Sequence, residues 1–384
     1  MKRRWNFYVV MAEEEMRQDT TGTTNVPLFE KLRSRIDEID LQILSLLAAR
    51  QAIAKDIGLQ KKRMGLDLID SAREQAVIER LVKQVKPPLT ARDVKAIFTE
   101  IISAARSIQQ PVSVAYLGPE GSFCHQAAAK FFGSASELRP EQTVEDVFSM
   151  VEKEQCNRGM VPIENSYQGS VALTLDLFHE FDLRIQGEIF LRIRHQLLGR
   201  EENREEIRYV YSHPMALAQC RSWLKKNMPD VKIIKTGSTS EAARLVSSKK
   251  YAGAIGSKIA ARIYDLKIVC QDIEDNANNI TRFLVIGKDS PEKSLRDKTS
   301  VLFSLPHMAG TLNRAIEPLA QNGINMTRIE SRPVKGKKWE YLFFVDIEGH
   351  KDDDNVAYAL REMEKACSYF KHLGSYPAGG EPWD

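Results

Sequence analysis

The spacing of apolar and polar residues divides the chain into three segments. Over residues 27–110, apolar side chains recur with the period of an α-helix. Over residues 112–288, short β-rich runs alternate with helical stretches, a pattern typical of an α/β domain. A charged linker over 288–298 precedes the last segment, residues 299–378. The pattern therefore predicts a helical domain, an α/β domain and a third, smaller domain.

The last segment predicts six short elements. They follow the order strand, helix, strand, strand, helix, strand, at residues 299–305, 310–322, 324–331, 341–348, 355–369 and 372–376. This order is the ferredoxin-like α+β arrangement. Pro318 falls inside the first of the two helices and should start or kink it.

The first segment predicts a long helix that carries positive charges on its apolar face. At about 100° per residue, Arg33, Arg50 and Lys61 fall on the same arc as the apolar stripe of residues 27–63. A buried cation without an anionic partner is strongly destabilising. These three side chains therefore need either carboxylates of the protein or an anionic ligand.

The length of this helix predicts an oligomer. At 1.5 Å per residue it would be about 55 Å long, and the shorter helices predicted over 70–86 and 90–109 cannot cover its whole stripe. The uncovered part predicts an intertwined homodimer or a larger homo-oligomer. Along the axis, Arg50 and Lys61 would lie about 16 Å apart, whereas Arg33 would lie about 25 Å from Arg50. We therefore expect Arg33 to serve a site completed by the partner chain.

This arrangement resembles the all-helical class of chorismate mutases over residues 27–110. The resemblance implies that chorismate is bound by Arg33, Arg50, Lys61, Asp70, Arg73, Glu74 and Gln109. Within that set, Lys61 and Gln109 would be the catalytic groups that face the ether oxygen of chorismate. The Claisen rearrangement of chorismate to prephenate is unimolecular, so a compact bound conformer and positive charge near that oxygen suffice.

Simpler roles remain open for several of these residues. Asp70 and Glu74 could be helix-capping groups, and Lys61 lies in a basic run of the kind that usually faces solvent. Where many members of the family place a serine in the third helix, this chain has Ala105. The helical domain could therefore also be a degenerate dimerisation unit beside an active dehydratase.

Five short motifs in the second segment stand at strand ends or in loops, where α/β sheets collect ligand contacts. They lie at residues 118–123, 161–169, 212–220, 236–240 and 279–283. Each motif alone could be structural. Thr239 or Ser240 would serve as the N-cap of the following helix, and His213 before Pro214 would shape a turn. Their combination and order are more specific than any single motif.

Together, the five motifs resemble prephenate dehydratase over the whole second segment. The resemblance implies a bilobal α/β fold, similar to that of periplasmic binding proteins, with the pocket between the lobes. It assigns to prephenate the residues Ser122, Glu164, Asn165, Ser212, Gln219, Ser240 and Thr281. Thr281 would be the catalytic group. Because a threonine hydroxyl is too weakly acidic to be a general acid, we expect it to donate a hydrogen bond to the departing ring hydroxyl. The product would be phenylpyruvate.

No cofactor or metal is expected for either reaction. The seven histidines are scattered, and no pair of them has the spacing of a metal site. No acidic cluster suggests magnesium.

The last segment resembles an ACT domain, a small module that pairs across a dimer and binds amino acids. The resemblance implies feedback inhibition by phenylalanine, which would be bound by Gly310, Thr311, Leu312, Glu330, Ser331, Arg332 and Pro333. Gly310 would admit the ligand backbone, and the following helix start would attract its carboxylate. Thr311 replaces the more usual alanine. The alternative is that these residues form only a turn and a surface strand end.

Composition limits the class of protein and the cellular compartment that fit this sequence. A net charge of +3 over 384 residues is close to balance and does not suggest a nucleic-acid-binding protein. The apolar runs fall far short of the roughly 20 residues of a membrane span. The five cysteines lack close pairing, which argues against a disulfide framework. Residues 1–26 are expected to be a disordered extension, with Met11 as a second candidate start. These features fit a cytoplasmic protein best.

These resemblances predict a bifunctional enzyme of phenylalanine biosynthesis, similar to the chorismate mutase/prephenate dehydratase family with a C-terminal ACT domain. The first activity would be that of an isomerase and the second that of a lyase. The main rival is a sensor, in which the bilobal domain captures a small aromatic acid and the ACT domain reports it. An enzyme should turn chorismate into phenylpyruvate without an added cofactor, whereas a sensor should bind without turnover.

Overall fold

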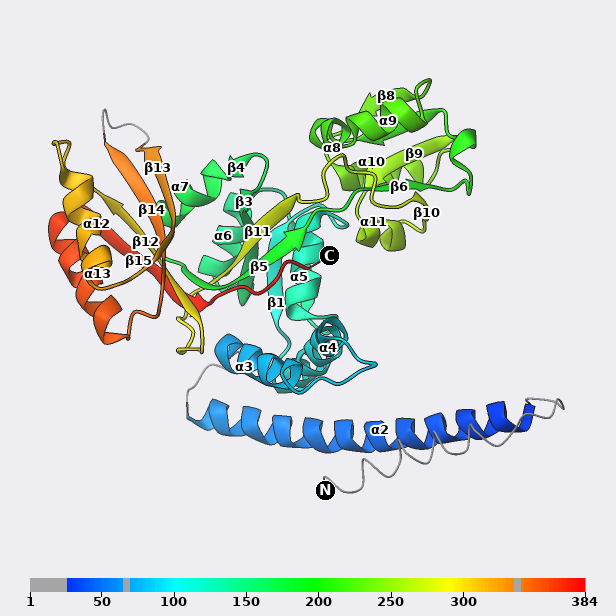
Figure 1. The fold of residues 1–384 in the computed structure, drawn as a ribbon, viewed down its shortest axis with the longest axis horizontal. Coiled ribbons are helices and arrows are strands. Elements are labelled where there is room, and N and C mark those ends of the chain that lie inside the picture. Colours follow the sequence, from blue (N-terminus) through cyan, green and yellow to red (C-terminus); the bar gives the residue numbers. More distant parts are fainter. Residues whose placement is uncertain (1–25, 65–69, 335–339, 384) are drawn as a thin grey trace. The chain divides into compact units, whose positions relative to one another are not determined.

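The computed structural model of the chain describes residues 26–64, 70–334 and 340–383 (Figure 1). The chain divides into two units between Ile53 and Ala54. The N-terminal extension that the sequence predicts lies outside the described residues, apart from Val26. The first unit is therefore described by one element, the N-terminal part of helix α2.

Helix α2 (Val26–Arg63) is 38 residues long and confirms the long helix predicted from the apolar stripe. In the first unit, the side chains of Leu32, Ile36 and Ile43 are exposed. A contiguous exposed apolar surface usually marks an interaction site. The first unit thus presents apolar side chains that another chain could cover.

Three helical pieces open the second unit, namely the end of α2, α3 (Ser71–Val82) and α4 (Ala91–Gln109). Asp70 caps α3 with its side chain, and Thr90 and Asp93 form a reciprocal capping box at the start of α4. Such caps satisfy backbone N–H groups that have no partner inside the helix. The predicted second helix is confirmed but ends at Val82.

The α/β segment forms two lobes, each built on its own sheet. In lobe 1 the strand order is β2-β1-β3-β11-β5, with β4 paired to β3. Its strands are β1 (Ser113–Leu117), β2 (Glu137–Glu141), β3 (Arg158–Asn165), β4 (Gly169–Ser170), β5 (Arg184–Arg192) and β11 (Ile280–Gly287). Its helices are α5 (Phe123–Phe132), α6 (Val144–Glu152) and α7 (Ala172–Glu180). Apolar clusters cover both faces of this sheet, which explains its long buried strands.

In lobe 2 the strand order is β10-β6-β9-β7-β8. Its strands are β6 (Gln196–Gly199), β7 (Tyr209–Ser212), β8 (Lys232–Lys235), β9 (Ala252–Gly256) and β10 (Lys267–Cys270). Its helices are η1 (Arg204–Glu206), α8 (Pro214–Gln219), α9 (Arg221–Asn227), α10 (Thr239–Val246) and α11 (Lys258–Ile263). The chain passes from lobe 1 to lobe 2 after β5 and returns before β11 (Figure 1). This confirms the bilobal fold that the motifs predict.

The last segment forms one antiparallel sheet in the order β13-β14-β12-β15. Its elements are β12 (Asp297–Ser304), α12 (Thr311–Gln321), β13 (Met326–Pro333), β14 (Tyr341–Glu348), α13 (Asp354–Ala366) and β15 (Tyr369–Pro377). Helices α12 and α13 cover one face of the sheet (Figure 1). The opposite face contributes Leu302, Phe344 and Tyr376 to a core shared with lobe 1. The ferredoxin-like order is confirmed.

Two details of this module differ from the prediction. Helix α12 begins at Thr311 and contains Pro318 at an internal position, so the proline does not start it. Tyr369, predicted as the end of a helix, begins strand β15 and lies opposite Ser304 of β12. The pairing with β12 decides its conformation. The periodicity of apolar residues in a sequence gives no information on such a long-range contact.

Candidate active sites and ligand site

The residues predicted to bind chorismate fall in both units of the chain. Arg33 and Arg50 belong to the first unit and the other five to the second. The guanidinium of Arg33 is exposed, pairs with Glu30 at 3.1 Å and lies 4.1 Å from the ring centroid of Phe29. Arg50 is partly buried.

In the second unit, Glu74 lies among several charged groups. Its carboxylate is 3.2 Å from Nε of Arg106, a buried side chain of α4. Burial raises the pKa of the Glu74 carboxyl, and the Arg106 guanidinium offsets part of that rise. Asp70 and Lys61 also lie near enough to influence the Glu74 pKa. Lys61, Asp70 and Glu74 of the predicted set therefore lie near one another. Arg73, on α3 beside Glu74, has an exposed side chain.

Arg106 is a member of this cluster that sequence reasoning missed. Its Nη2 donates to the carbonyl of Phe132, at the end of helix α5, at 3.1 Å. It therefore links the helical segment to lobe 1. Its only signal in the sequence is a cation beside Ala105 in the third predicted helix.

Gln109 lies against the end of α2. Its Nε2 donates to the carbonyl of Ala54 at 2.9 Å. Gly58 makes this approach possible, because a β-carbon there would lie 2.6 Å from Cγ of Gln109. This bond uses one of the two N–H donors of the Gln109 amide, so the second N–H and Oε1 can still interact with other groups.

Two residues predicted for prephenate, Asn165 and Thr281, face each other across the paired strands β3 and β11. Asn165 Nδ2 donates to Thr281 Oγ1 at 2.9 Å. The backbone N–H groups of Tyr167 and Gln168 donate to Asn165 Oδ1, at 2.9 and 3.2 Å, and so orient the amide. Because Thr281 accepts this bond, its own hydrogen can point elsewhere.

Asn279 completes this group and was not among the predicted site residues. Its Oδ1 accepts a second hydrogen bond from Asn165 Nδ2, at 2.8 Å. Its side chain is buried, and within the described part of the chain its Nδ2 has no hydrogen-bond partner. A buried donor without a partner is costly, and Asn279 lines a cavity of about 370 Å³. A ligand oxygen in that cavity would supply the partner.

Gln219 lines the same cavity and is held by a histidine. His195 Nε2 lies 2.7 Å from Gln219 Oε1. Burial lowers the pKa of His195, so the ring is neutral and its Nε2–H donates to the glutamine oxygen. The Gln219 NH₂ group can then face a ligand. His195 lies outside the five motifs, so the sequence alone gave no sign that it orients Gln219.

Three serines of the predicted set make hydrogen bonds within the lobes or between them. Ser122 caps α5 by accepting the backbone N–H of His125 at 3.1 Å. Ser240, in lobe 2, donates to the carbonyl of Glu120 in lobe 1. Ser212 is buried and donates to the carbonyl of Ile255 at 2.8 Å. The prediction that Thr239 or Ser240 caps the following helix was wrong, because Ser238 is the N-cap of α10.

Gly121 lies where lobe 2 contacts the first motif. Its φ of +83° is in the left-handed region, and a β-carbon there would lie 2.7 Å from Ser240 Oγ. The hydroxyl of Ser257 also donates to the Gly121 carbonyl, at 2.7 Å. The missing side chain of Gly121 therefore leaves room for Ser240, while Ser257 binds the backbone carbonyl of the same residue.

Glu164 contacts the sheet of the last module. Its carboxylate is 3.6 Å from Nε of Arg328, on β13. Its neighbour Asn165, by contrast, belongs to the polar group around Thr281.

The residues predicted to bind phenylalanine lie at the start of α12 and along β13. Gly310 has a φ of +80° and is the N-cap of α12. On β13, burial alternates so that Arg328, Glu330 and Arg332 share one face of the strand. Arg332 lies 3.7 Å from Asp176 of α7 in lobe 1. This face of β13 is therefore in contact with lobe 1.

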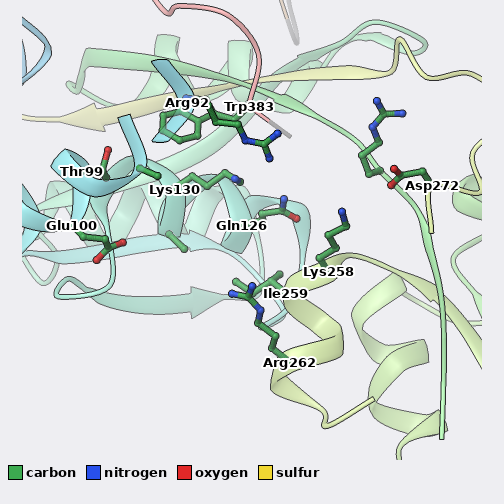
Figure 2. Close-up of a pocket in the computed structure, with 13 residues that line it drawn as sticks. Arg92, Thr99, Glu100, Gln126, Lys130, Lys258, Ile259, Arg262, Asp272 and Trp383 are labelled. Carbon is green, nitrogen blue, oxygen red and sulfur yellow. The ribbon is translucent and has the colours of Figure 1, made fainter. Parts of the chain in front are cut away.

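A second cavity has a positively charged lining and belongs to neither predicted substrate site. Its volume is about 640 Å³, and side chains of α4, α5 and α11 surround it (Figure 2). Its basic residues are Arg92, Lys130, Arg194, Lys258 and Arg262, against two acidic residues, Glu100 and Asp272. Figure 2 shows Lys258 and Arg262 extending from α11 on the lobe 2 side.

The described residues can also be compared with the expectations for metal sites, membrane spans and disulfides. Over 26–64, 70–334 and 340–383, no group of three or more His, Cys, Asp or Glu side chains could hold a metal ion. Within the same ranges, a helix with the length and apolar character of a membrane span is not found. The five cysteines are free, which agrees with the expectation of no disulfide framework.

The fold and these groups define a class of protein: a multidomain enzyme for small anionic substrates with a terminal ligand-sensing module. The chain matches the family models Chorismate mutase type II over residues 32–110, Prephenate dehydratase over 114–291 and ACT domain over 299–364. It is 44% identical to a bifunctional chorismate mutase/prephenate dehydratase of Aquifex aeolicus, over 91% of this chain and 97% of that protein.

Two solved structures are also similar. Each match covers 69% of this chain and has a TM-score of 0.65. One is a prephenate dehydratase from Arthrobacter aurescens in complex with L-Phe, 32% identical, of which 90% is covered. The other is GqqA, described as a novel type of quorum quenching acylase, 30% identical, of which 98% is covered. This chain belongs to the bifunctional chorismate mutase/prephenate dehydratase family.

Proposed function

We propose that the chain converts chorismate to prephenate in its helical segment and prephenate to phenylpyruvate between the two α/β lobes, under control of phenylalanine. Membership of the family supports both activities. The ACT domain, and a relative solved with L-Phe, support phenylalanine as the effector.

The hydrogen bond from Asn165 to Thr281 carries the assignment of the dehydratase site. In the reaction, the bond between the ring and its carboxylate breaks and its electron pair enters the ring. The bond to the opposite ring hydroxyl then breaks, giving phenylpyruvate, CO₂ and hydroxide. Because Thr281 accepts from Asn165 at 2.9 Å, its own hydrogen is available to stabilise the departing hydroxyl.

The carboxylates of prephenate need hydrogen-bond donors that take no part in the reaction. Gln219 and Asn279 line the cavity beside Asn165, and Nδ2 of Asn279 lacks a partner among the described residues. Both amides are neutral, so they can orient a carboxylate without holding it as tightly as a cation would. We assign them to substrate orientation.

The mutase site is proposed to form between two copies of the chain. Arg33 and Arg50 would hold the carboxylates of chorismate, and Lys61 and Gln109 would face its ether oxygen. Exposed apolar side chains such as Ile36 and Ile43 on α2 support a homodimer in which a second helix covers them. Sedimentation should give a dimer or a larger oligomer. A monomer that still isomerises chorismate would contradict this arrangement.

The activity is tested by supplying the purified chain with chorismate and following prephenate and phenylpyruvate, with and without phenylalanine. Both products should form without an added cofactor, and phenylalanine should slow the formation of phenylpyruvate. A sensor would bind prephenate and yield neither product. A degenerate mutase domain would leave chorismate unchanged while added prephenate is still consumed.

A further inference from the structure

Next to the Asn165 and Thr281 pair lies a second pair of residues, with opposite charges. In the register of β3 and β11, Thr281 lies opposite Asn165, and Arg282 lies opposite Glu164. In the ACT sheet, Arg328 of β13 lies opposite Asp346 of β14. Each sheet thus contributes one cation and one anion at directly opposed positions.

These four residues contact each other between lobe 1 and the ACT sheet. Arg282 Nη1 is 2.5 Å from Asp346 Oδ2, and Arg328 Nε is 3.6 Å from Glu164 Oε2. We call Glu164, Arg282, Arg328 and Asp346 the charge quartet. Each ion pair joins one residue of the dehydratase sheet to one of the ACT sheet, so a shift between the sheets changes both distances.

Burial makes one pair of the quartet, Arg282 and Asp346, sensitive to such a shift, whereas the Glu164 side chain of the other pair is 42% exposed. The side chain of Arg282 is 5% exposed and that of Asp346 is 0% exposed. Arg282 Nε is also 2.6 Å from Glu188 of β5, and its Nη2 donates to the hydroxyl of Tyr376 at 3.0 Å. A buried ion pair depends strongly on good geometry, because displaced charges are left without water.

The strand that carries Arg328 also carries the proposed phenylalanine residues. Arg328, Glu330 and Arg332 share the face of β13 that meets lobe 1. Arg328 Nη2 also donates to Ser170 Oγ of β4 at 2.7 Å. A ligand that favours one position of β13 would therefore bias the position of β3 and β4, beside Asn165.

We propose that the charge quartet is a positioning device, which holds Thr281 and Asn165 in register and transmits the phenylalanine state of the ACT sheet to them. The inference rests on the proposed function, since it requires dehydratase turnover and phenylalanine inhibition. Glu164 and Arg282 act here through their neighbours Asn165 and Thr281.

The test separates phenylalanine binding from phenylalanine inhibition in the full-length protein. Arg328→Gln removes the cation that the ACT sheet contributes to the quartet and changes no residue of the dehydratase strands. Calorimetry should show that the variant still binds phenylalanine. The phenylalanine concentration for half inhibition should rise by at least about 5-fold, the low end of typical allosteric coupling.

Two matched variants sharpen this result. Arg328→Lys keeps the charge and should restore most of the inhibition. Arg361→Gln makes the same chemical change at an exposed position of α13 and should behave as the wild type. Inhibition of Arg328→Gln at wild-type concentrations, or loss of phenylalanine binding together with inhibition, would overturn the proposal.

Asp346→Asn tests the positioning role without phenylalanine. It keeps the shape of the side chain and removes the charge that faces Arg282. Dehydratase kcat should fall by about 10-fold, a moderate effect for a misplaced catalytic group, with little change in KM and none in mutase turnover. Unchanged kcat in a folded variant would overturn the positioning role. Failure of the wild type to convert prephenate would instead refute the proposed function, and the positioning role with it.

Discussion

The hydroxyl of Thr281 has one assigned acceptor role, toward Asn165, and one proposed donor role, toward substrate. Thr281→Val keeps the shape of the side chain and removes both. Dehydratase kcat should fall by roughly 10²- to 10³-fold, as expected when a donor to developing negative charge is lost. Steady-state assays with prephenate measure this, and mutase turnover in the same preparation is the control. Thr281→Ser, which keeps the hydroxyl, should retain much of the activity. A fully active valine variant would exclude the donor role.

Gly121 gives a second prediction at the level of a single residue. Gly121→Ala would combine a φ of +83° with a β-carbon 2.7 Å from Ser240 Oγ. We expect a loss of about 1–3 kcal/mol in the free energy of unfolding. Gly169→Ala is the matched control, since Gly169 has a φ of +72° and open space around its β-carbon position. Denaturant unfolding of both variants separates backbone strain from crowding. Equal losses would show that the contact with Ser240 is unimportant.

At the level of elements, the sequence predicted the helices and strands well where a local pattern decides them. Strands β1, β7, β9 and β11 contain the β-rich runs at 114–117, 209–211, 252–255 and 283–286, and the ferredoxin-like order follows from periodicity alone. Errors occurred where a distant partner decides the outcome. Tyr369 is a strand residue because β12 lies beside it.

The same distinction applies to the candidate sites. Asn165 and Thr281 could be predicted from motifs and do lie together. Asn279 stands in one of those motifs, but its lack of a partner becomes visible only in three dimensions. Glu164 was predicted to bind prephenate, yet its contact with Arg328 depends on how lobe 1 packs against the ACT sheet. A sequence pattern does not contain that packing.

Strand β15 carries a histidine that should make stability depend on pH. Burial, together with the nearby cations Lys351 and Arg184, lowers the pKa of His372 from 6.5 to about 4. Between about pH 6.5 and pH 4 the unfolded chain binds a proton at this histidine that the folded chain does not. This contribution to stability is therefore present above pH 6.5 and is lost as the pH falls toward 4.

Burial also lowers the pKa values of His125 and His195, so they act in the same direction. The melting temperature should therefore drop between pH 7 and pH 5, and it should drop less for His372→Gln. His179→Gln, at an exposed position of α7, should keep the wild-type slope. Identical slopes in both variants would show that His372 is not responsible.

At the scale of the whole molecule, the modules of the second unit share both apolar cores and charges. One core joins residues of lobe 1, such as Phe178, to Phe344 and Tyr376 of the ACT sheet. Arg106 similarly connects α4 to the end of α5. Because apolar cores and buried charges cross these boundaries, changes in one module can alter activity in another.

The positively charged cavity gives a last prediction at this scale. Both substrates carry two carboxylates, and a cavity lined by more basic than acidic residues should raise their local concentration. The double change Lys258→Glu and Arg262→Glu should lower kcat/KM for prephenate by roughly 3-fold or more at low ionic strength, with kcat unchanged. The difference should disappear at about 1 M salt, where the screening length is only about 3 Å.

The control makes an equal change of charge elsewhere in lobe 2. Lys225→Glu with Lys226→Glu alters two exposed residues of α9 that do not line the cavity. If the cavity attracts substrate, this control should lose much less kcat/KM than the first double variant. Equal losses would mean that net charge alone, and not the cavity, accounts for the attraction. A loss that persists at high salt would point to direct contact with prephenate, since screening weakens long-range attraction far more than a hydrogen bond.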